Sequence, residues 1–163
     1  MRDVENTKPV FNLSLTWRCG SHFLKNLLCL HPDCCFNEVN HEDRLINKSY
    51  ILENYINETY FFKNLALENG SANKEDLLSK YLEHLGKAIL SYYYSYSDRK
   101  KRVIFKTPDV HNIENTFKLF PEAYLLILVR DGRSCVESLL NTNWDWLNRI
   151  ETDFILLIIH IYS

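Results

Sequence analysis

Positive charge is not in excess in this sequence, and its absence excludes one broad class of function. The 163 residues include 19 Lys or Arg and 21 Asp or Glu, which gives a formal net charge of −2 at pH 7. Such a chain has no bulk attraction for nucleic acid or for an anionic membrane surface. We therefore expect no nucleic-acid partner, and any anion site must be built locally.

Long hydrophobic runs are also missing. The most apolar stretch, FILLIIHIY at 154–162, has nine residues, whereas a helix needs about 20 to span a bilayer. The N-terminal sequence MRDVENTKPV is polar and has no apolar signal core. These absences predict a cytoplasmic protein without a membrane span.

The cysteines lack the spacing of a metal site. There are five, an odd number: Cys19, Cys29, Cys34, Cys35 and Cys135. They show no zinc-knuckle spacing, and Cys34 and Cys35 are adjacent, so these two cannot easily bridge each other. We expect reduced thiols and no bound metal.

No repeats or low-complexity linkers interrupt the chain, and its apolar pattern predicts one α/β domain. Apolar runs typical of buried strands lie at 9–15, 102–106 and 123–130. Each is followed by a turn and by apolar residues at helical spacing. This alternation predicts a three-layer α/β/α fold with a mostly parallel sheet. The run at 123–130 is expected to be a central strand covered on both faces.

Helical patterns surround the second strand. A helical insert is expected over 38–98, clearest from 74 to 96, with Asn73 as an N-cap. Ser134 and Glu137 fit a capping box, so the last helix is predicted to begin at Ser134. Another helix is expected just after the second strand, with four residues facing inward: Ile113, Phe117, Leu119 and Phe120.

The turn after the first strand combines groups that bind anions. Residues 16–22, TWRCGSH, contain Arg18 and Gly20 and lead into an apolar helix. Backbone amides at a helix start and a guanidinium group suit a sulfate or a phosphate. A Walker A motif would need a Lys directly after the glycine. Ser21 stands there instead, so a magnesium–ATP site is not favoured.

A second cluster of anion-binding groups follows the third strand. In LVRDGRSCVES, Arg130 ends the strand and Ser138 lies about one turn into the next helix. Because binding sites form at the carboxyl ends of parallel strands, these residues predict a second anion pocket. Lys106, which ends its own strand, could lie between the two pockets. The alternative is a local ion pair between Arg130 and Asp131, with Ser138 as an ordinary helix residue.

Three motifs in this order resemble the PAPS-dependent sulfotransferases, in particular the branch that includes tyrosylprotein sulfotransferases and bacterial relatives. The motifs are WRCGSHFLKNLLCLHPD, KTP and LVRDGRSCVES. They lie within about residues 10–40 and 102–145. The sequence departs from the family pattern at Trp17, Cys19 and His22, where the family has Pro or Gly, Ser, and Thr.

This resemblance implies a fold, a donor and a donor site. The fold is akin to that of P-loop nucleoside kinases, and the donor is 3′-phosphoadenylyl sulfate (PAPS), used without a catalytic metal. Arg130 and Ser138 would hold the 3′-phosphate, within a half-domain that spans 102–145. The 5′-phosphosulfate would be held by five turn residues: Arg18, Cys19, Gly20, Ser21 and His22.

The resemblance also implies sulfuryl transfer to a hydroxyl or amine on a small-molecule, carbohydrate or protein acceptor. Arg18 would stabilise the sulfonate, and Lys106 would meet the charge that develops on the bridging oxygen. The family's Glu base follows the His-Pro pair, which points to Glu38, with Glu42 nearby. His111 is the second candidate for the base.

Two other functions stay open. Family members extend further at the C-terminus, so residues 1–163 are expected to be a single but partial domain. Such a domain could be a catalytically inactive sulfotransferase-like protein. The other alternative is a P-loop kinase-like nucleotide-binding protein. The sequence does not predict the oligomeric state.

Overall fold

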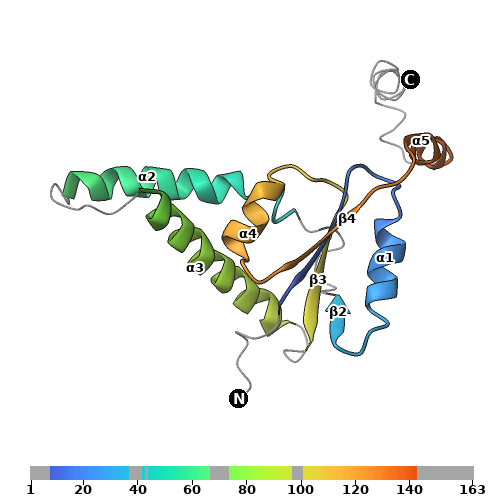
Figure 1. Cartoon of the computed structure of the whole chain (residues 1–163), viewed down its shortest axis with the longest axis horizontal. Helices are drawn as coiled ribbons and strands as arrows, with labels where there is room; N and C mark the ends of the chain where they lie inside the picture. Colours follow the sequence, from blue (N-terminus) through green and yellow to red (C-terminus); the bar gives the residue numbers. More distant parts are fainter. Residues whose placement is uncertain (1–7, 37–41, 43, 67–73, 97–100, 143–163) are drawn as a thin grey trace.

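The computed structural model describes residues 8–36, 42, 44–66, 74–96 and 101–142, and the statements below concern these residues. They form a parallel sheet with helices on both faces (Figure 1), so the predicted three-layer α/β/α fold is confirmed. The strands are β1 (Val10–Ser14), β2 (Cys34–Phe36), β3 (Arg102–Thr107) and β4 (Tyr124–Leu128), in the sheet order β2-β3-β1-β4. The helices are α1 (Ser21–Leu28), α2 (Tyr50–Ala66), α3 (Lys74–Ser95), α4 (Thr116–Leu119) and α5 (Gly132–Leu140), with a short 3₁₀ helix, η2 (Ile113–Asn115), before α4.

Side-chain alternation along the strands gives the sheet two different faces. Phe11 and Phe105 are register partners in β1 and β3, and their rings stack with centroids 4.9 Å apart. Phe120, after α4, packs on Phe11 at 4.9 Å between ring centroids, and Tyr93 of α3 meets Phe105 edge-on. The main core therefore lies between this face and the layer that contains α3 and α4 (Figure 1).

The opposite face lies against α1 (Figure 1) and carries polar side chains. Asn12 and Lys106 are the next register pair, and both are buried. Asn12 Nδ2 donates a hydrogen bond to the carbonyl oxygen of Ser21 at the start of α1. The same face also carries the buried register pair Val10 and Ile104, so it combines apolar packing with bonded polar side chains.

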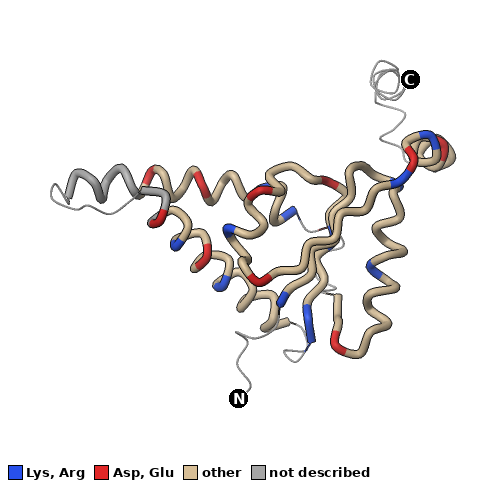
Figure 2. Tube along the Cα trace, viewed as in Figure 1, with Lys and Arg blue, Asp and Glu red and all other residues tan. Residues whose placement is uncertain are grey.

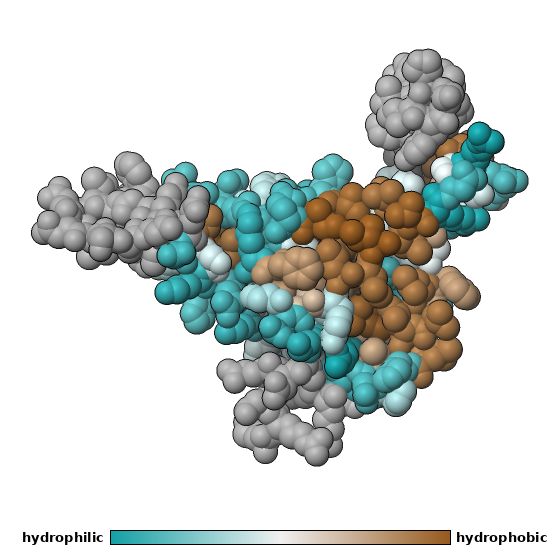
Figure 3. All heavy atoms as spheres, in the orientation of Figure 1, coloured by the Kyte–Doolittle hydropathy of each residue, from teal (hydrophilic) through white to brown (hydrophobic). Residues whose placement is uncertain are grey.

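Within the described part of the chain, β4 is an edge strand, which corrects the prediction of a central strand covered on both faces. Its neighbour is β1, and Tyr124 and Ile127 are 47% and 48% exposed. A continuous apolar run looks the same in sequence whether a strand has one neighbour or two. Figure 3 shows apolar surface gathered on the side of the molecule where α1 and β4 lie, and its exposed members include Phe23 and Leu27 of α1.

The start of α5 also differs from the prediction. The helix begins at Gly132, and its N-cap is Asp131, whose side chain accepts from the amides of Arg133 and Ser134. The prediction that the helix begins at Ser134 is therefore wrong. The sequence offers a capping side chain at both Asp131 and Ser134, and the helix takes the earlier one because this satisfies its first amides.

The segment before α4 and the short strand β2 also differ from the sequence pattern. Phe117 was expected to face inward but is 51% exposed. The 3₁₀ turn that precedes α4 winds more tightly than an α-helix, so an α-helical period assigns the wrong face there. Strand β2 was not predicted, since its three residues are too few to show a period. The proposed N-cap Asn73 lies outside the described residues. No described helix has the length and apolar content that a membrane crossing requires.

Candidate functional site

The loop between β1 and α1 is bent so that it presents the start of α1. Arg18 and Gly20 have φ values of 64° and 98°, a region that glycine enters freely and arginine only at a cost. The first bond of α1 runs from Leu24 N to the carbonyl oxygen of Gly20. The amides before Leu24 therefore have no acceptor inside the helix. Together with the helix dipole, they favour an anion at this point.

The two predicted anion clusters lie side by side, because β1 and β4 are neighbours and end at the same edge of the sheet. Arg18 Nε donates to Ser138 Oγ at 3.0 Å. Arg130 Nη1 donates to the carbonyl oxygen of Arg18, also at 3.0 Å. The sequence separations of these contacts are 120 and 112 residues. The structure thus joins the two clusters into one site.

The carboxylate of Asp131 has a structural role beside this site. It accepts from the backbone amides of Arg133 and Ser134 at 3.4 Å and from Ser134 Oγ at 3.2 Å. Desolvation raises the pKa of Asp131, but these hydrogen bonds outweigh it and hold the pKa below its ordinary value. Asp131 therefore acts as the N-cap of α5. The side chain of Arg130 donates instead to the carbonyl oxygen of Arg18.

Lys106 places a buried cation at the same edge of the sheet. Its side chain is 1% exposed, and Nζ lies 3.0 Å from Glu42 Oε1 and 3.1 Å from His22 Nε2. An ammonium group donates and does not accept, so His22 Nε2 serves as the acceptor in the tautomer that carries its proton on Nδ1. The carboxylate of Glu42 balances the buried charge. Lys106 therefore reaches from β3 to the first turn of α1, where the anion-binding amides lie.

The other predicted turn residues are partly internal. Cys19 is buried, with its Sγ atom 3.5 Å from that of Cys135 in α5. Ser21 is also buried, and its carbonyl oxygen is bonded to Asn12. Glu38, the first candidate for the base, lies outside the described residues.

His111, the second candidate for the base, lies near Asp109. The imidazole is exposed, its backbone amide donates to Asp109 Oδ1 at 2.8 Å, and its ring contacts the same oxygen. Burial raises the pKa of Asp109, but the bonds from His111 lower it below its ordinary value. Among the described contacts, none joins His111 to Lys106.

Charges of both signs are interspersed over the described chain (Figure 2), so the anion site depends on local groups rather than on a basic surface. Within that part of the chain, no three His, Cys, Asp or Glu side chains are grouped to hold a metal ion. Sequence reasoning missed the contacts of Lys106 with His22 and Glu42. The sequence carries no signal for them, because they span 84 and 64 residues and depend on side-chain directions.

Comparison with known proteins gives a family. A family model described as "Sulfotransferase family" matches residues 9–156, which contain all four strands and the Arg18, Lys106 and Arg130 positions. No curated protein matches the chain at a significant level. The match covers well over half of the 163 residues. The chain belongs to the sulfotransferase family.

Proposed function

We propose that this protein transfers a sulfuryl group from PAPS to a hydroxyl or amine acceptor. The main support for this proposal is that three cationic side chains lie at the carboxyl ends of neighbouring strands. Arg18 follows β1, Lys106 lies near the end of β3, and Arg130 follows β4. The start of α1 adds backbone amides at the same edge. Together these groups suit a ligand with several negative charges.

The donor would bind across the joined clusters. Arg18 and the first amides of α1 would hold the 5′-phosphosulfate, with the loop conformation set by Gly20. Arg130 and Ser138 would hold the 3′-phosphate. The bond between Arg18 Nε and Ser138 Oγ would be exchanged for bonds to the donor, so both side chains are already near their ligand positions.

Transfer would need charge stabilisation more than covalent help. By analogy with phosphoryl transfer, the transition state is loose, and positioning dominates. The sulfur–oxygen bond to the acceptor forms while the bond to the bridging phosphate oxygen breaks, which releases 3′,5′-adenosine bisphosphate. Lys106 would meet the charge on that bridging oxygen, and burial strengthens its field. Glu38 would take the acceptor proton.

Calorimetry with 3′,5′-adenosine bisphosphate in EDTA tests donor binding. We expect binding without magnesium, and a loss of about 10- to 100-fold in affinity in Arg130→Ala, because charge-assisted hydrogen bonds to a phosphate disappear. Lys118→Met, which removes an exposed lysine bonded to Glu53, is the matched control. Binding of ATP that requires magnesium, with none of the bisphosphate, would favour a kinase-like protein instead.

Turnover separates an enzyme from a non-catalytic domain. Labelled PAPS would be incubated with a phenol, an amino sugar and a tyrosine peptide, so that each class of acceptor and both hydroxyl and amine groups are represented. We expect label in at least one acceptor together with release of 3′,5′-adenosine bisphosphate. Bisphosphate binding without transfer to any of them would point to a non-catalytic member of the family.

The cytoplasmic location stays a prediction.

A further inference from the structure

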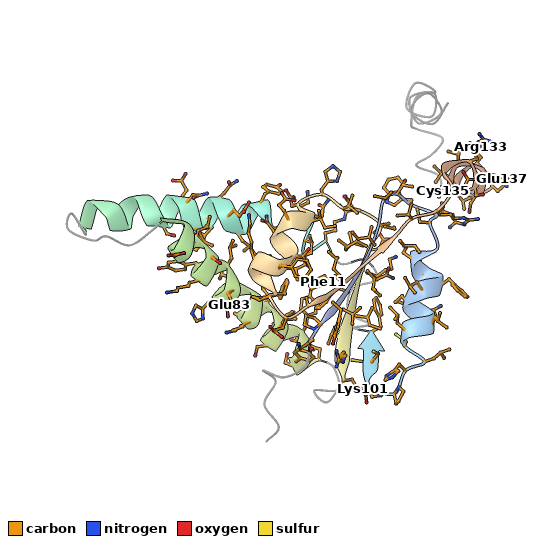
Figure 4. All side chains as sticks on the ribbon, viewed as in Figure 1. Phe11, Glu83, Lys101, Arg133, Cys135 and Glu137 are labelled. Atoms are coloured by element: carbon orange, nitrogen blue, oxygen red, sulfur yellow. The ribbon has the colours of Figure 1, made fainter. Side chains whose placement is uncertain are left out.

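Two buried cysteines join the loop before α1 to the first turn of α5. Cys19 and Cys135 are 5% and 4% exposed, and their Sγ atoms lie 3.5 Å apart although 116 residues separate them in sequence. Figure 4 shows Cys135 on the side of α5 that faces the rest of the molecule, while Arg133 and Glu137 lie on its outer side. The two thiols therefore lie at the contact between the loop before α1, which carries Arg18, and helix α5, which carries Ser138.

We infer that Cys19 and Cys135 form a site of oxidative modification, in which a small-molecule disulfide converts the two thiols into an intramolecular disulfide. A disulfide requires sulfurs about 2.05 Å apart, so the two atoms must approach by roughly 1.5 Å. The loop carries Arg18 and Gly20 on either side of Cys19, and α5 is one short helix at the end of β4. The disulfide therefore requires a small shift of this loop or of α5 toward the other.

The chemistry balances with a disulfide as the oxidant. One cysteine attacks as thiolate, forms a mixed disulfide and releases one small thiol. The second cysteine then attacks the mixed disulfide and releases the second small thiol. The protein loses two protons and two electrons, and the oxidant is reduced to two thiols. No further reactant is needed.

Both thiols are buried, which limits the access of the oxidant, so we expect a slow reaction at neutral pH. Burial, followed by the hydrogen bond with Cys19, raises the pKa of Cys135 to about 11. Below that value its thiolate fraction grows about tenfold for each pH unit. We therefore expect the rate of oxidation to increase with pH. It should also increase under conditions that separate the loop from α5.

The disulfide between Cys19 and Cys135 would weaken donor binding, a consequence that rests on the proposed function. The bonds between Arg18 and Ser138 and between Arg130 and the Arg18 carbonyl join the same two elements. A disulfide would hold Arg18 against Ser138 and so oppose the entry of a phosphate between them. Oxidation should weaken the binding of 3′,5′-adenosine bisphosphate by about tenfold, the value of one charge-assisted hydrogen bond.

The test uses the full chain and oxidised glutathione at pH 8, with free thiols then blocked and peptides identified by mass spectrometry. A second sample is refolded from urea in the same mixture, so that burial cannot hide the thiols. We expect one dominant cross-link, between Cys19 and Cys135, in both samples. It should be absent from Cys19→Ser and Cys135→Ser and present in Cys29→Ser, the matched control.

The outcomes separate the parts of the inference. If Cys19 and Cys135 remain thiols, or carry only glutathione, in the refolded sample, the modification site is wrong. If the reduced protein does not bind the bisphosphate, the proposed function fails while the cross-link result stands by itself. If reduced and oxidised proteins bind it equally, the site exists but its effect on the donor is overturned.

Discussion

Replacing Gly86 by alanine should remove about 3 kcal/mol from the free energy of unfolding. A Cβ at this position would lie 1.9 Å from the carbonyl oxygen of Leu119 and 2.7 Å from its carbonyl carbon. These are backbone atoms, which cannot rotate away, so α3 and α4 would have to separate. Leu82, Leu119 and Phe120 at this contact are almost fully buried. The intrinsic helix preference for alanine, about 1 kcal/mol, is too small to offset the clash.

Urea unfolding followed by circular dichroism measures this change. Ser91→Ala, an exposed change in the same helix, is the control and should leave the midpoint almost unchanged. For a chain of this length, a loss of 3 kcal/mol corresponds to a fall in Tm of about 6–12 °C. Equal or greater stability of the Gly86→Ala variant would mean that α3 and α4 do not pack as closely as described.

Replacing Lys106 by methionine should lower the turnover of PAPS by about 10²- to 10³-fold. The ammonium group is the buried cation at the edge of the sheet, and the methionine side chain keeps most of the volume of the lysine stem. Its partner Glu42 is 44% exposed in its side chain, so water can solvate the carboxylate that loses its counter-ion. We therefore expect the variant to fold and to lose chemistry rather than structure.

The design of this experiment depends on two readouts. The bridging oxygen stays on the bisphosphate as a charged 5′-phosphate oxygen, so Lys106→Met should weaken bisphosphate binding as well as lower kcat. Lys118→Met again serves as the control, because it makes the same substitution at an exposed lysine that is also bonded to a glutamate. If Lys106→Met keeps full turnover, the lysine is not the group that stabilises the leaving oxygen.

Local sequence patterns predicted the parts of the fold that depend on short stretches. The strands near 9–15 and 102–106 were predicted because buried parallel strands are continuous apolar runs. The edge position of β4 among the described strands could not be predicted, since the number of neighbouring strands depends on distant parts of the chain. The cap of α5 was missed because Asp131 and Ser134 both satisfy the local rule, and only the folded helix decides between them.

For the candidate site, some residues could be predicted from the sequence, but the contacts between them could not. Arg18, Lys106 and Arg130 could be selected because each lies at or just beyond the end of a strand, and parallel strands end at one edge of a sheet. The contacts among the side chains could not be predicted. The pairs Lys106–His22 and Cys19–Cys135 join distant parts of the sequence, and their geometry depends on rotamers that the packing selects.

We propose that Arg130 and Ser138 bind the 3′-phosphate of one nucleotide whose other end is held at Arg18. The most direct measurement compares the affinities for 3′,5′-adenosine bisphosphate and for 5′-AMP, which lacks that phosphate, in the unaltered protein and in Arg130→Ala. We predict that the unaltered protein prefers the bisphosphate by about 10- to 100-fold and that Arg130→Ala loses this preference while it still binds 5′-AMP. An unaltered protein that binds both nucleotides equally, or an Arg130→Ala variant that keeps the preference, would contradict the account.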